Sequence, residues 1–436
     1  MYAVGAVVLL VVAAAFVGRH IEQTRHTLHV GWPPLYANWL PHVGPGTPLA
    51  LAVAAATVAY GPTLATTLRW RTLLTVSWAT ATAWILGLAL VDGVDRGFAG
   101  RLTTRYEYLR VVDRFHDIPA TLQDFTRHIL IDSPQHWPPH TAGHPPAAPI
   151  TFVLLDRIGL GGGGWAAWWC VLVGATGCLA VLVTLRALAS EELARRAAPF
   201  LVLAPAAVWM GVSADAYFAA VAAWAVALLA LAVTGRHPAW AAASGLLYGL
   251  TCYLSYGLTL YALIGAAVLF LGRHQVRAHP ALLALPLLAG FAVVVTAFTW
   301  AGFNWWEAYR LLTTRYYQGA GGVRPYSYWV WANLACTALV VGPATVAGLR
   351  RTPALLLRRT PAHAPRRHLA LLTSTALLAL LLADLSGMSK AETERIWLPF
   401  ALWLLATGAH LPHPRAWLTA QALLALAVNH ALITGW

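Results

Sequence analysis

Three histidines, His136, His140 and His144, lie in or directly before the proline-rich segment WPPHTAGHPPAAP, residues 137–149. Histidines four residues apart would stack on one helical face and could hold a metal ion, but the Pro-Pro pair before His140 disfavours such a helix. No metal site is therefore expected from these residues. The second Pro-Pro pair suits the first turn of a helix, whose free N–H groups attract phosphate. We expect His144, beside that helix start, to contact a phosphate.

Carboxylates gather in the same region, because seven of the chain's 16 Asp and Glu lie between residues 92 and 147. This polar stretch is longer than most loops that lack structure, so a functional role is expected. Apolar residues at helical spacing predict two short amphipathic helices that lie along a membrane interface with their apolar faces down. One set is Tyr106, Leu109, Val112 and Phe115, and the other is Leu122, Phe125 and Ile129.

The elements that must position these residues are membrane helices. Of the 436 residues, 59% are hydrophobic and only 10% are charged, whereas soluble domains carry about 25% charged residues. Apolar runs long enough to cross a bilayer recur along the chain, and they do not alternate with the period of two that marks a membrane β-barrel. The sequence predicts a single all-α, polytopic membrane domain, residues 1–436, with roughly 11–13 transmembrane helices.

Charge placement predicts the orientation of these helices. The most basic loop, residues 350–368, contains no acid, and the positive-inside rule makes it cytoplasmic. Alternation then places the N-terminus inside, and the net charge of +13 follows from topology, so no nucleic-acid partner is expected. The segment 148–185 is interrupted by GLGGGG and is expected to be a broken or partly re-entrant helix. The other loops expected inside lie near residues 69–71, 186–196, 235–238, 272–280 and 412–415.

A second outer loop, residues 303–328, is rich in aromatic residues and arginine. Trp and Tyr are common at the headgroup level of a membrane, so an interfacial aromatic belt is one interpretation. The alternative is a binding surface, in which Trp306 or Tyr326 stacks on a sugar and Arg324 binds a phosphate.

Three segments together resemble the GT-C superfamily of membrane glycosyltransferases, and they look most like its protein-mannosyltransferase and aminoarabinose-transferase branch. RYEYL, residues 105–109, resembles an acidic segment of the family's first large outer loop. GHPPA, residues 143–147, is similar to the H/K-P-P-L step that opens the next membrane helix, and also to the GHPPG of actinobacterial membrane proteins. ETERIWLP, residues 392–399, resembles the late E-x-R-Y-x-x-P segment.

The resemblance implies roles for individual residues. An outer-loop carboxylate would act as general base, with Glu107 as the first candidate and Asp95, Asp113 and Asp215 as competitors. The family's acidic pair before Arg-Tyr is replaced here by two threonines, so its catalytic acid is not carried over directly. The residues expected to bind substrate are His144 and Arg395 for the donor phosphate, and Asp215, Glu392, Glu394, Arg324, Tyr326 and Trp306 for the rest.

The resemblance also implies a reaction. A sugar would pass, with inversion, from a polyprenyl-phosphate donor to a glycan or lipid acceptor of the cell envelope, at the outer face of a bacterial plasma membrane. Some relatives use a divalent cation, which clustered carboxylates could hold, and no other cofactor is implied. The rival class is a polytopic transporter or lipid flippase, which would place ionisable residues near the bilayer midplane. Most acids here lie at expected outer helix ends, with Asp384 as the exception.

Overall fold

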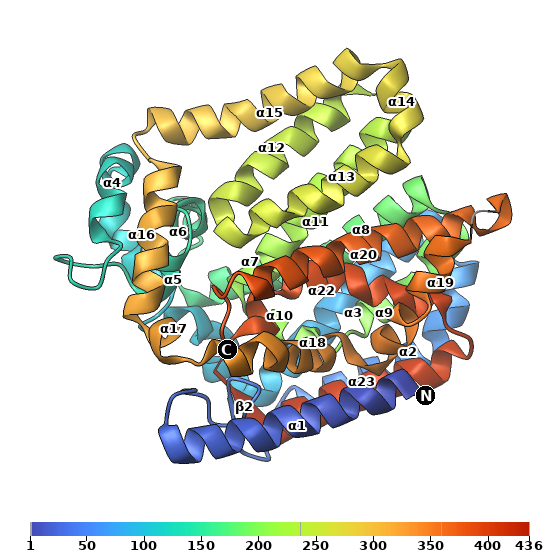
Figure 1. The fold of residues 1–436 in the computed structure, drawn as a ribbon, viewed down its shortest axis with the longest axis horizontal. Coiled ribbons are helices and arrows are strands. Elements are labelled where there is room, and N and C mark those ends of the chain that lie inside the picture. Colours follow the sequence, from blue (N-terminus) through green and yellow to red (C-terminus); the bar gives the residue numbers. More distant parts are fainter. Residues whose placement is uncertain (1, 236, 359, 436) are drawn as a thin grey trace.

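The computed structural model describes residues 2–235, 237–358 and 360–435, which form one helical bundle (Figure 1). Arg236 and Arg359, which belong to two of the loops expected inside, lie outside the described residues. Eight segments of this structure are long and apolar enough to cross a membrane. They are built by α1 (Tyr2–Arg25), α2 (Thr47–Thr67), α3 (Trp70–Ala89) with η1 (Leu90–Asp92), α7 (Gly163–Ala175) with α8 (Gly177–Leu188), α11 (Ala214–Gly235), α15 (Pro280–Trp300), α18 (Tyr326–Leu349), and η7 (Pro361–His363) with α20 (Ala364–Leu385).

Shorter helices complete the bundle. The predicted all-α, polytopic fold class is confirmed, and the described residues also contain two shorter apolar helical segments, residues 256–271 and 398–410. The shorter helices of the bundle are α9 (Glu191–Val202), α10 (Ala207–Met210), α12 (Pro238–Leu254), η6 (Tyr256–Leu260), α13 (Tyr261–Leu271), α14 (Arg273–Ala278), α19 (Thr352–Leu357), α21 (Thr393–Ile396), α22 (Leu398–Leu405), η8 (Ala406–His410) and α23 (Pro414–Ala431).

The segment between residues 92 and 147 folds into short helices instead of an open loop. They gather at one end of the bundle beside α16 (Trp305–Gln318) and α17 (Ala320–Val323), while α14, α19 and the N-terminus lie at the other end (Figure 1). The short helices are the π-helical turn η2 (Asp95–Ala99), η3 (Arg101–Thr103), η4 (Tyr108–Phe115), α4 (Ile118–Asp124), η5 (Phe125–His128) and α5 (Pro139–Gly143). We call this group the outer-loop helices.

The apolar faces of the outer-loop helices pack on protein. Leu122, Phe125 and Ile129 are fully buried, as their spacing predicted, and the Phe125 ring lies 5.2 Å from the Trp137 ring. In η4 the buried residues are Tyr108, Val111 and Phe115, so the prediction that Tyr106 shares this face is wrong, and Tyr106 is 41% exposed. These contacts fix the outer-loop helices to the bundle as part of its core.

The helix that was expected to be interrupted within residues 148–185 is interrupted. An 11-residue helix, α6 (Ala147–Arg157), ends before the glycine run, and a new helix starts at Gly163. The Arg157 side chain donates to the carbonyl oxygens of Phe115 and His116, both at 2.8 Å, and so ties α6 to η4. The chain thus re-enters the bundle on a short helix that packs under the outer-loop helices.

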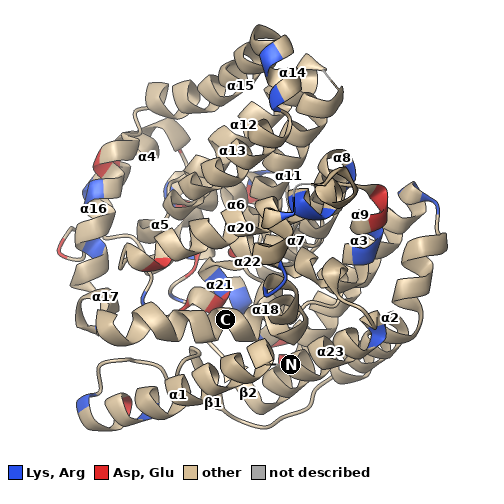
Figure 2. Ribbon diagram, turned by 45° about the vertical axis from the view of Figure 1, so that its right-hand side comes forward, with Lys and Arg blue, Asp and Glu red and all other residues tan. Residues whose placement is uncertain are grey.

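Charged residues are scarce along the long helices and gather at their ends (Figure 2). One small antiparallel sheet joins distant parts of the chain, pairing β1 (Ala37–Trp39) with β2 (Leu432–Thr434). The carbonyl oxygen of Tyr36, next to β1, accepts a bond from the Gly435 N–H at 2.9 Å. The segment before α2 is therefore tied to the segment after α23.

Glycine allows two helices to touch closely. A Cβ on Gly290 of α15 would lie 2.2 Å from the carbonyl oxygen of Ala242 in α12, and one on Gly245 would lie 1.9 Å from the Leu287 carbonyl oxygen. Small residues at helix contacts are typical of membrane bundles, where close backbone packing replaces hydrophobic burial.

We predict that Gly290→Ala lowers the free energy of unfolding by about 1–3 kcal/mol, because the added methyl group forces two backbones apart. A thermal unfolding scan of the detergent-purified protein measures this as a lower Tm. Gly164→Ala in α7 is the matched control, since a Cβ there meets nothing within 4 Å. Equal Tm values for the two variants would contradict the packing described.

Candidate functional site

A chain of ion pairs connects four elements at the end of the bundle that carries the outer-loop helices. Glu107 precedes η4, and its Oε2 lies 3.0 Å from Nδ1 of His140 in α5. The other ring nitrogen of His140, Nε2, lies 3.3 Å from Nη2 of Arg395 in α21. Arg395 in turn forms an ion pair with Asp215 in the first turn of α11. We call these four residues the outer network.

The ring of His140 has a partner at each of its two nitrogens. A guanidinium can only donate, so Nε2 of His140 accepts from Arg395. Nδ1 faces the Glu107 carboxylate, whose Oε2 lies 3.0 Å away. His140 thus links the carboxylate of Glu107 to the guanidinium of Arg395.

Burial makes the electrostatics of the network strong. Asp215 and Arg395 are 4% and 5% exposed, and buried charges must be paired to be tolerated. Burial alone would raise the pKa of Glu107, but His140 and the nearby guanidinium groups of Arg395 and Arg101 hold it below its ordinary value. Burial would likewise lower the pKa of Arg395, yet Asp215, Glu107 and Glu392 raise it. Glu107 is a carboxylate and Arg395 a cation at neutral pH.

The segment before α21 extends this network. Oε2 of Glu392 lies 4.0 Å from Arg395 Nη2, and its Oε1 lies 3.1 Å from Nη1 of Arg324. Arg324 is 6% exposed and also donates to the carbonyl oxygens of Leu28 and Lys390. Glu394 is fully buried, and its Oε1 accepts from the Tyr36 N–H at 2.9 Å. Each of these contacts holds the loop that presents Arg395.

The backbone of this loop is unusual. Ala391 and Glu392 both have positive φ, at 70° and 63°. Such values are uncommon for residues other than glycine, and they cluster at functional sites where surrounding contacts compensate the strain. Asn333 supplies one such contact, since its Nδ2 donates to Ser389 O at 2.6 Å and to Asp384 Oδ1 at 2.8 Å. Asp384, the exception noted for a transporter, therefore anchors this loop.

His144 lies beside the network, and its contacts leave no ring N–H to donate to a phosphate. Its Nδ1 donates to the His140 carbonyl oxygen at 2.8 Å, and its ring packs 5.7 Å from the ring of Tyr108. Burial lowers the pKa of His144 to about 4, so the ring is neutral and its single proton is already used. The predicted contact of His144 with a donor phosphate is not supported, and His140 occupies the central position instead.

Four of the predicted residues lie apart from the network. Asp95 and Asp113 are exposed, and Trp306 is 71% exposed with its ring against Trp305. The Tyr326 hydroxyl donates to the Leu385 carbonyl oxygen at 3.2 Å. The structure brings together the other candidates, namely Glu107, Asp215, Glu392, Glu394, Arg324 and Arg395, with His144 packed beneath them.

Sequence analysis missed Arg101, in η3. Its side chain is buried at 8% exposure, and its Nη2 has no hydrogen-bond partner in the described part of the chain. Burial lowers its pKa to about 10, with Arg96 acting in the same direction, while Glu107 and Asp92 raise it. A buried guanidinium with an unused donor is costly unless something accepts from it. The residues around Arg101 in sequence give no periodic signal that would have separated it from surface arginines.

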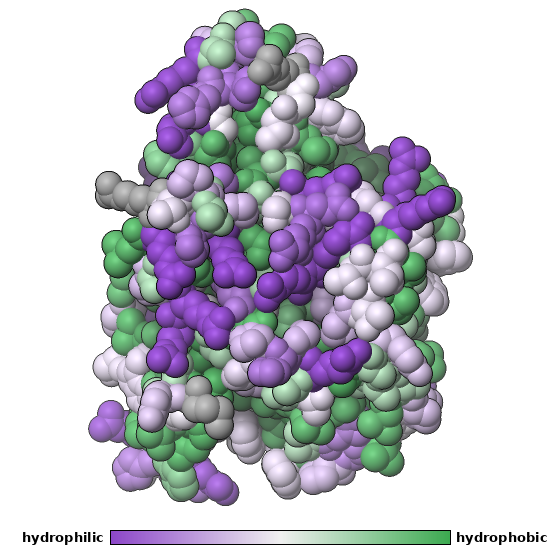
Figure 3. Space-filling view, turned by 90° about the vertical axis from the view of Figure 1, so that its right-hand side faces the viewer, coloured by the Kyte–Doolittle hydropathy of each residue, from purple (hydrophilic) through white to green (hydrophobic). Residues whose placement is uncertain are grey.

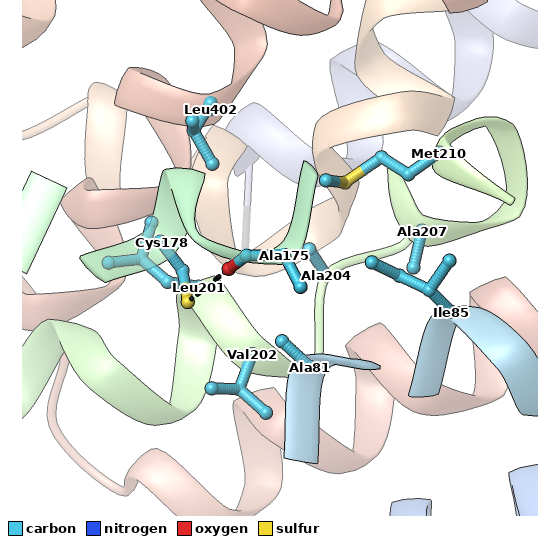
Figure 4. A pocket seen from close by; sticks show the side chains of 10 residues that line it. All are labelled: Ala81, Ile85, Ala175, Cys178, Leu201, Val202, Ala204, Ala207, Met210 and Leu402. Carbon is cyan, nitrogen blue, oxygen red and sulfur yellow. Dashed lines mark hydrogen bonds between the residues drawn. The ribbon is translucent and has the colours of Figure 1, made fainter. Parts of the chain in front are cut away.

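A separate apolar cavity lies among α3, α8 and the segment that joins α9 to α11 (Figure 4). Its volume is ≈ 10 Å³, about enough for a single water molecule. The Cys178 thiol on its wall donates to the Ala175 carbonyl oxygen at 3.1 Å. The lining is apolar and small, so this cavity is a packing gap and does not extend the site.

Fold and site together describe an all-α, multi-pass membrane protein with a buried polar network at one end of its bundle. No family model matches the chain, and no curated protein matches it. Among solved structures, it is similar to the oligosaccharyltransferase of Archaeoglobus fulgidus in complex with Zn and sulfate, with a TM-score of 0.50 and 14% identity over 82% of this chain. The chain spans about half the length of that protein, covering 52% of it.

A second protein gives a weaker match. ArnT from Cupriavidus metallidurans aligns over 82% of this chain and 78% of its own in the apo state, at a TM-score of 0.30 and 14% identity. Its form bound to undecaprenyl phosphate aligns at a TM-score of 0.28 and 13% identity, over 78% of this chain and 77% of that one. The likeness to the oligosaccharyltransferase shows that the two chains share an overall fold.

The pKa of His144 generates a prediction about stability. An unfolded histidine has a pKa near 6.5, and the folded value is about 4. Because the unfolded chain takes up this proton first, the contribution of His144 to stability is complete above pH 6.5 and is lost as pH falls toward 4. We expect the Tm to fall over this interval.

His144→Asn is the matched variant, because an amide N–H can still donate to the His140 carbonyl oxygen and does not titrate. Between pH 6.5 and 4.5 its Tm should fall less steeply than that of the unchanged protein. Parallel Tm curves for the two would show that His144 is not buried as a neutral ring.

Proposed function

We propose that the chain is a membrane glycosyltransferase that moves a sugar from a polyprenyl-phosphate donor to an acceptor of the cell envelope. The observation that carries the proposal is the outer network, in which the sequence segments that resemble GT-C enzymes meet around buried Arg395. The branch that includes protein mannosyltransferases and aminoarabinose transferases rests on those segments alone.

The proposed reaction is a single displacement. The acceptor hydroxyl oxygen bonds to the anomeric carbon, the bond from that carbon to the phosphate oxygen breaks, and polyprenyl phosphate leaves with the bonding electrons. Glu107 takes the hydroxyl proton as general base. A carboxylate of low pKa is a weak base, and it suffices because the hydroxyl becomes strongly acidic as its oxygen bonds to carbon. The Glu107 side chain is 13% exposed, so it is reachable.

Cations stabilise the departing phosphate in this scheme. Arg395 is held by Asp215 and Glu392, and Arg101 offers the unused Nη2 donor. Charge-assisted bonds from guanidinium groups to phosphate are among the strongest in proteins. We therefore assign Arg101 to the donor phosphate in place of His144, beside Arg395.

A divalent cation does not fit the described residues well. Within the described ranges, no three His, Cys, Asp or Glu side chains gather as a metal ion would require. The carboxylates of Glu107, Asp215 and Glu392 are each paired with His140 or an arginine. The proposed step is accordingly written without a metal ion.

The alternative, a transporter or lipid flippase, would use ionisable groups inside the bilayer. The buried charged residues of the described chain lie at or beyond helix ends, and this placement favours chemistry at one membrane face. They are Arg101, Asp215, Arg324, Asp384, Lys390, Glu394 and Arg395.

We predict that Glu107→Gln lowers kcat for sugar transfer at least 100-fold, since the amide cannot accept the proton while it preserves shape. The assay uses purified protein with a series of polyprenyl-phosphate sugars and a membrane-envelope extract as acceptor. Asp113→Asn is the control and should keep full activity, because Asp113 is exposed.

Arg101→Gln in the same assay should mainly weaken use of the donor, seen as a lower kcat/KM, with inhibition by free polyprenyl phosphate weakened in parallel. Full activity of Glu107→Gln, or absence of transfer from every donor by a folded protein, would count against the proposed function.

We further propose that the outer network faces the outside of a bacterial plasma membrane, with the N-terminus in the cytoplasm. Cysteine substitutions at Ser133 and Thr360 test this orientation. A membrane-impermeant maleimide added to intact cells should label Ser133→Cys, and it should label Thr360→Cys only after lysis. The reverse pattern would invert the topology.

A further inference from the structure

The end of the bundle opposite the outer network holds another buried imidazole, besides those of His140 and His144. His410 is the last residue of η8 and is only 6% exposed. Neither of its ring nitrogens has a hydrogen-bond partner within the described residues. A neutral imidazole carries one N–H donor and one acceptor nitrogen, and leaving both unused in a buried place is costly. Such an exception to the pairing of buried polar groups calls for an explanation.

Two arginines bind backbone carbonyl oxygens at His410 and at the residue after it. Nη1 of Arg351 donates to the His410 carbonyl oxygen at 2.5 Å, and Nη2 of Arg196 donates to the next one, Leu411 O, at 3.2 Å. The charges that act on the ring are those of Arg366, Arg196 and Arg351, and all are positive. Elements far apart in sequence, namely α9, which contains Arg196, and the segment from Arg351 to the first turn of α20, therefore bring guanidinium groups to one buried histidine.

The acids nearby do not balance these charges. The carboxylate of Glu192 is 3.8 Å from Arg196 and 78% exposed, which makes a weak ion pair. Arg366 is exposed, and the described structure gives it no ion pair or hydrogen bond. Hydrophilic side chains gather across the middle of this end of the molecule, with apolar side chains at the sides and below (Figure 3).

The positive-inside rule accounts for arginine in the loops of this end. It does not account for a buried imidazole without a partner in the described residues, or for two guanidinium groups that bind the carbonyl oxygens of His410 and Leu411. A bound anion would explain both the unpartnered ring and the arginines, because it would accept hydrogen bonds from the His410 N–H and from the guanidinium groups.

We propose that His410, Arg366, Arg351 and Arg196 form a binding site for a phosphate group, at the face of the membrane opposite the outer network. Guanidinium forks match phosphate oxygens in geometry and charge, and Arg366 gives the site an opening to the surface. The phosphate belongs either to an anionic lipid headgroup, which basic segments attract, or to a free anion in solution. This site is independent of the proposed transfer reaction.

Binding is tested by thermal unfolding of delipidated protein in neutral detergent. Sodium phosphate should raise the Tm in a saturable way relative to sodium chloride of equal ionic strength, as expected for a ligand that binds the folded state. A second arm compares nanodiscs of phosphatidylcholine with nanodiscs that contain phosphatidylglycerol, in buffer without phosphate. A gain in the first arm indicates the free anion and a gain confined to the second indicates the headgroup, and both support the site.

Arg366→Gln should weaken phosphate binding about tenfold, as expected when one charge-assisted bond is lost. Arg277→Gln is the matched control, because Arg277 is also exposed and basic but belongs to α14, away from His410. His410→Leu should abolish the stabilisation by phosphate while raising the Tm without it, since an orphaned polar ring is removed. No stabilisation in either arm, or equal loss in Arg277→Gln and Arg366→Gln, would overturn the proposal.

Discussion

The ion pair between Arg395 and Asp215 is the interaction on which the outer end of this protein depends. The two residues are 180 positions apart in sequence and almost fully buried. Removing one partner of such a pair costs about 3–5 kcal/mol, because the other charge is left buried alone. The pair fixes α21 against the start of α11, and through His140 it also fixes α5. The outer-loop helices are therefore held to the bundle by charge as well as by apolar packing.

The strained loop before α21 illustrates how this arrangement is maintained. Two successive left-handed residues turn the chain so that Glu392 reaches both Arg324 and Arg395. The bonds of Asn333 to Ser389 and Asp384 offset that strain. Rigid placement of the buried Arg395 cation fits the proposed transfer reaction, since donors that are already oriented need no reorganisation during a reaction.

Much of the fold could be predicted because apolar runs and prolines act locally. The run from Ala214 to Gly235 forms one helix, and the glycine run near residue 160 separates two. The site was harder, because His140 and His144 share the same local sequence, and only the tertiary arrangement turns one toward Glu107 and the other toward Tyr108. Arg101 was not predicted as a site residue for the same reason, since the burial of a single arginine is decided by the segments that pack over it.

The small sheet has a consequence for the order in which the protein matures. Tyr36 donates its N–H to Glu394 and accepts from Gly435, while β1 pairs with β2. Residues 432–435 leave the ribosome long after residue 36, so the support beneath Glu394 cannot form during most of translation and membrane insertion. Chains that end before residue 432 would insert their helices but would lack the β1–β2 pairing and the hydrogen bond from Gly435 to Tyr36. Completion of the end of the bundle that carries the outer network is thus coupled to the synthesis of residues 432–435.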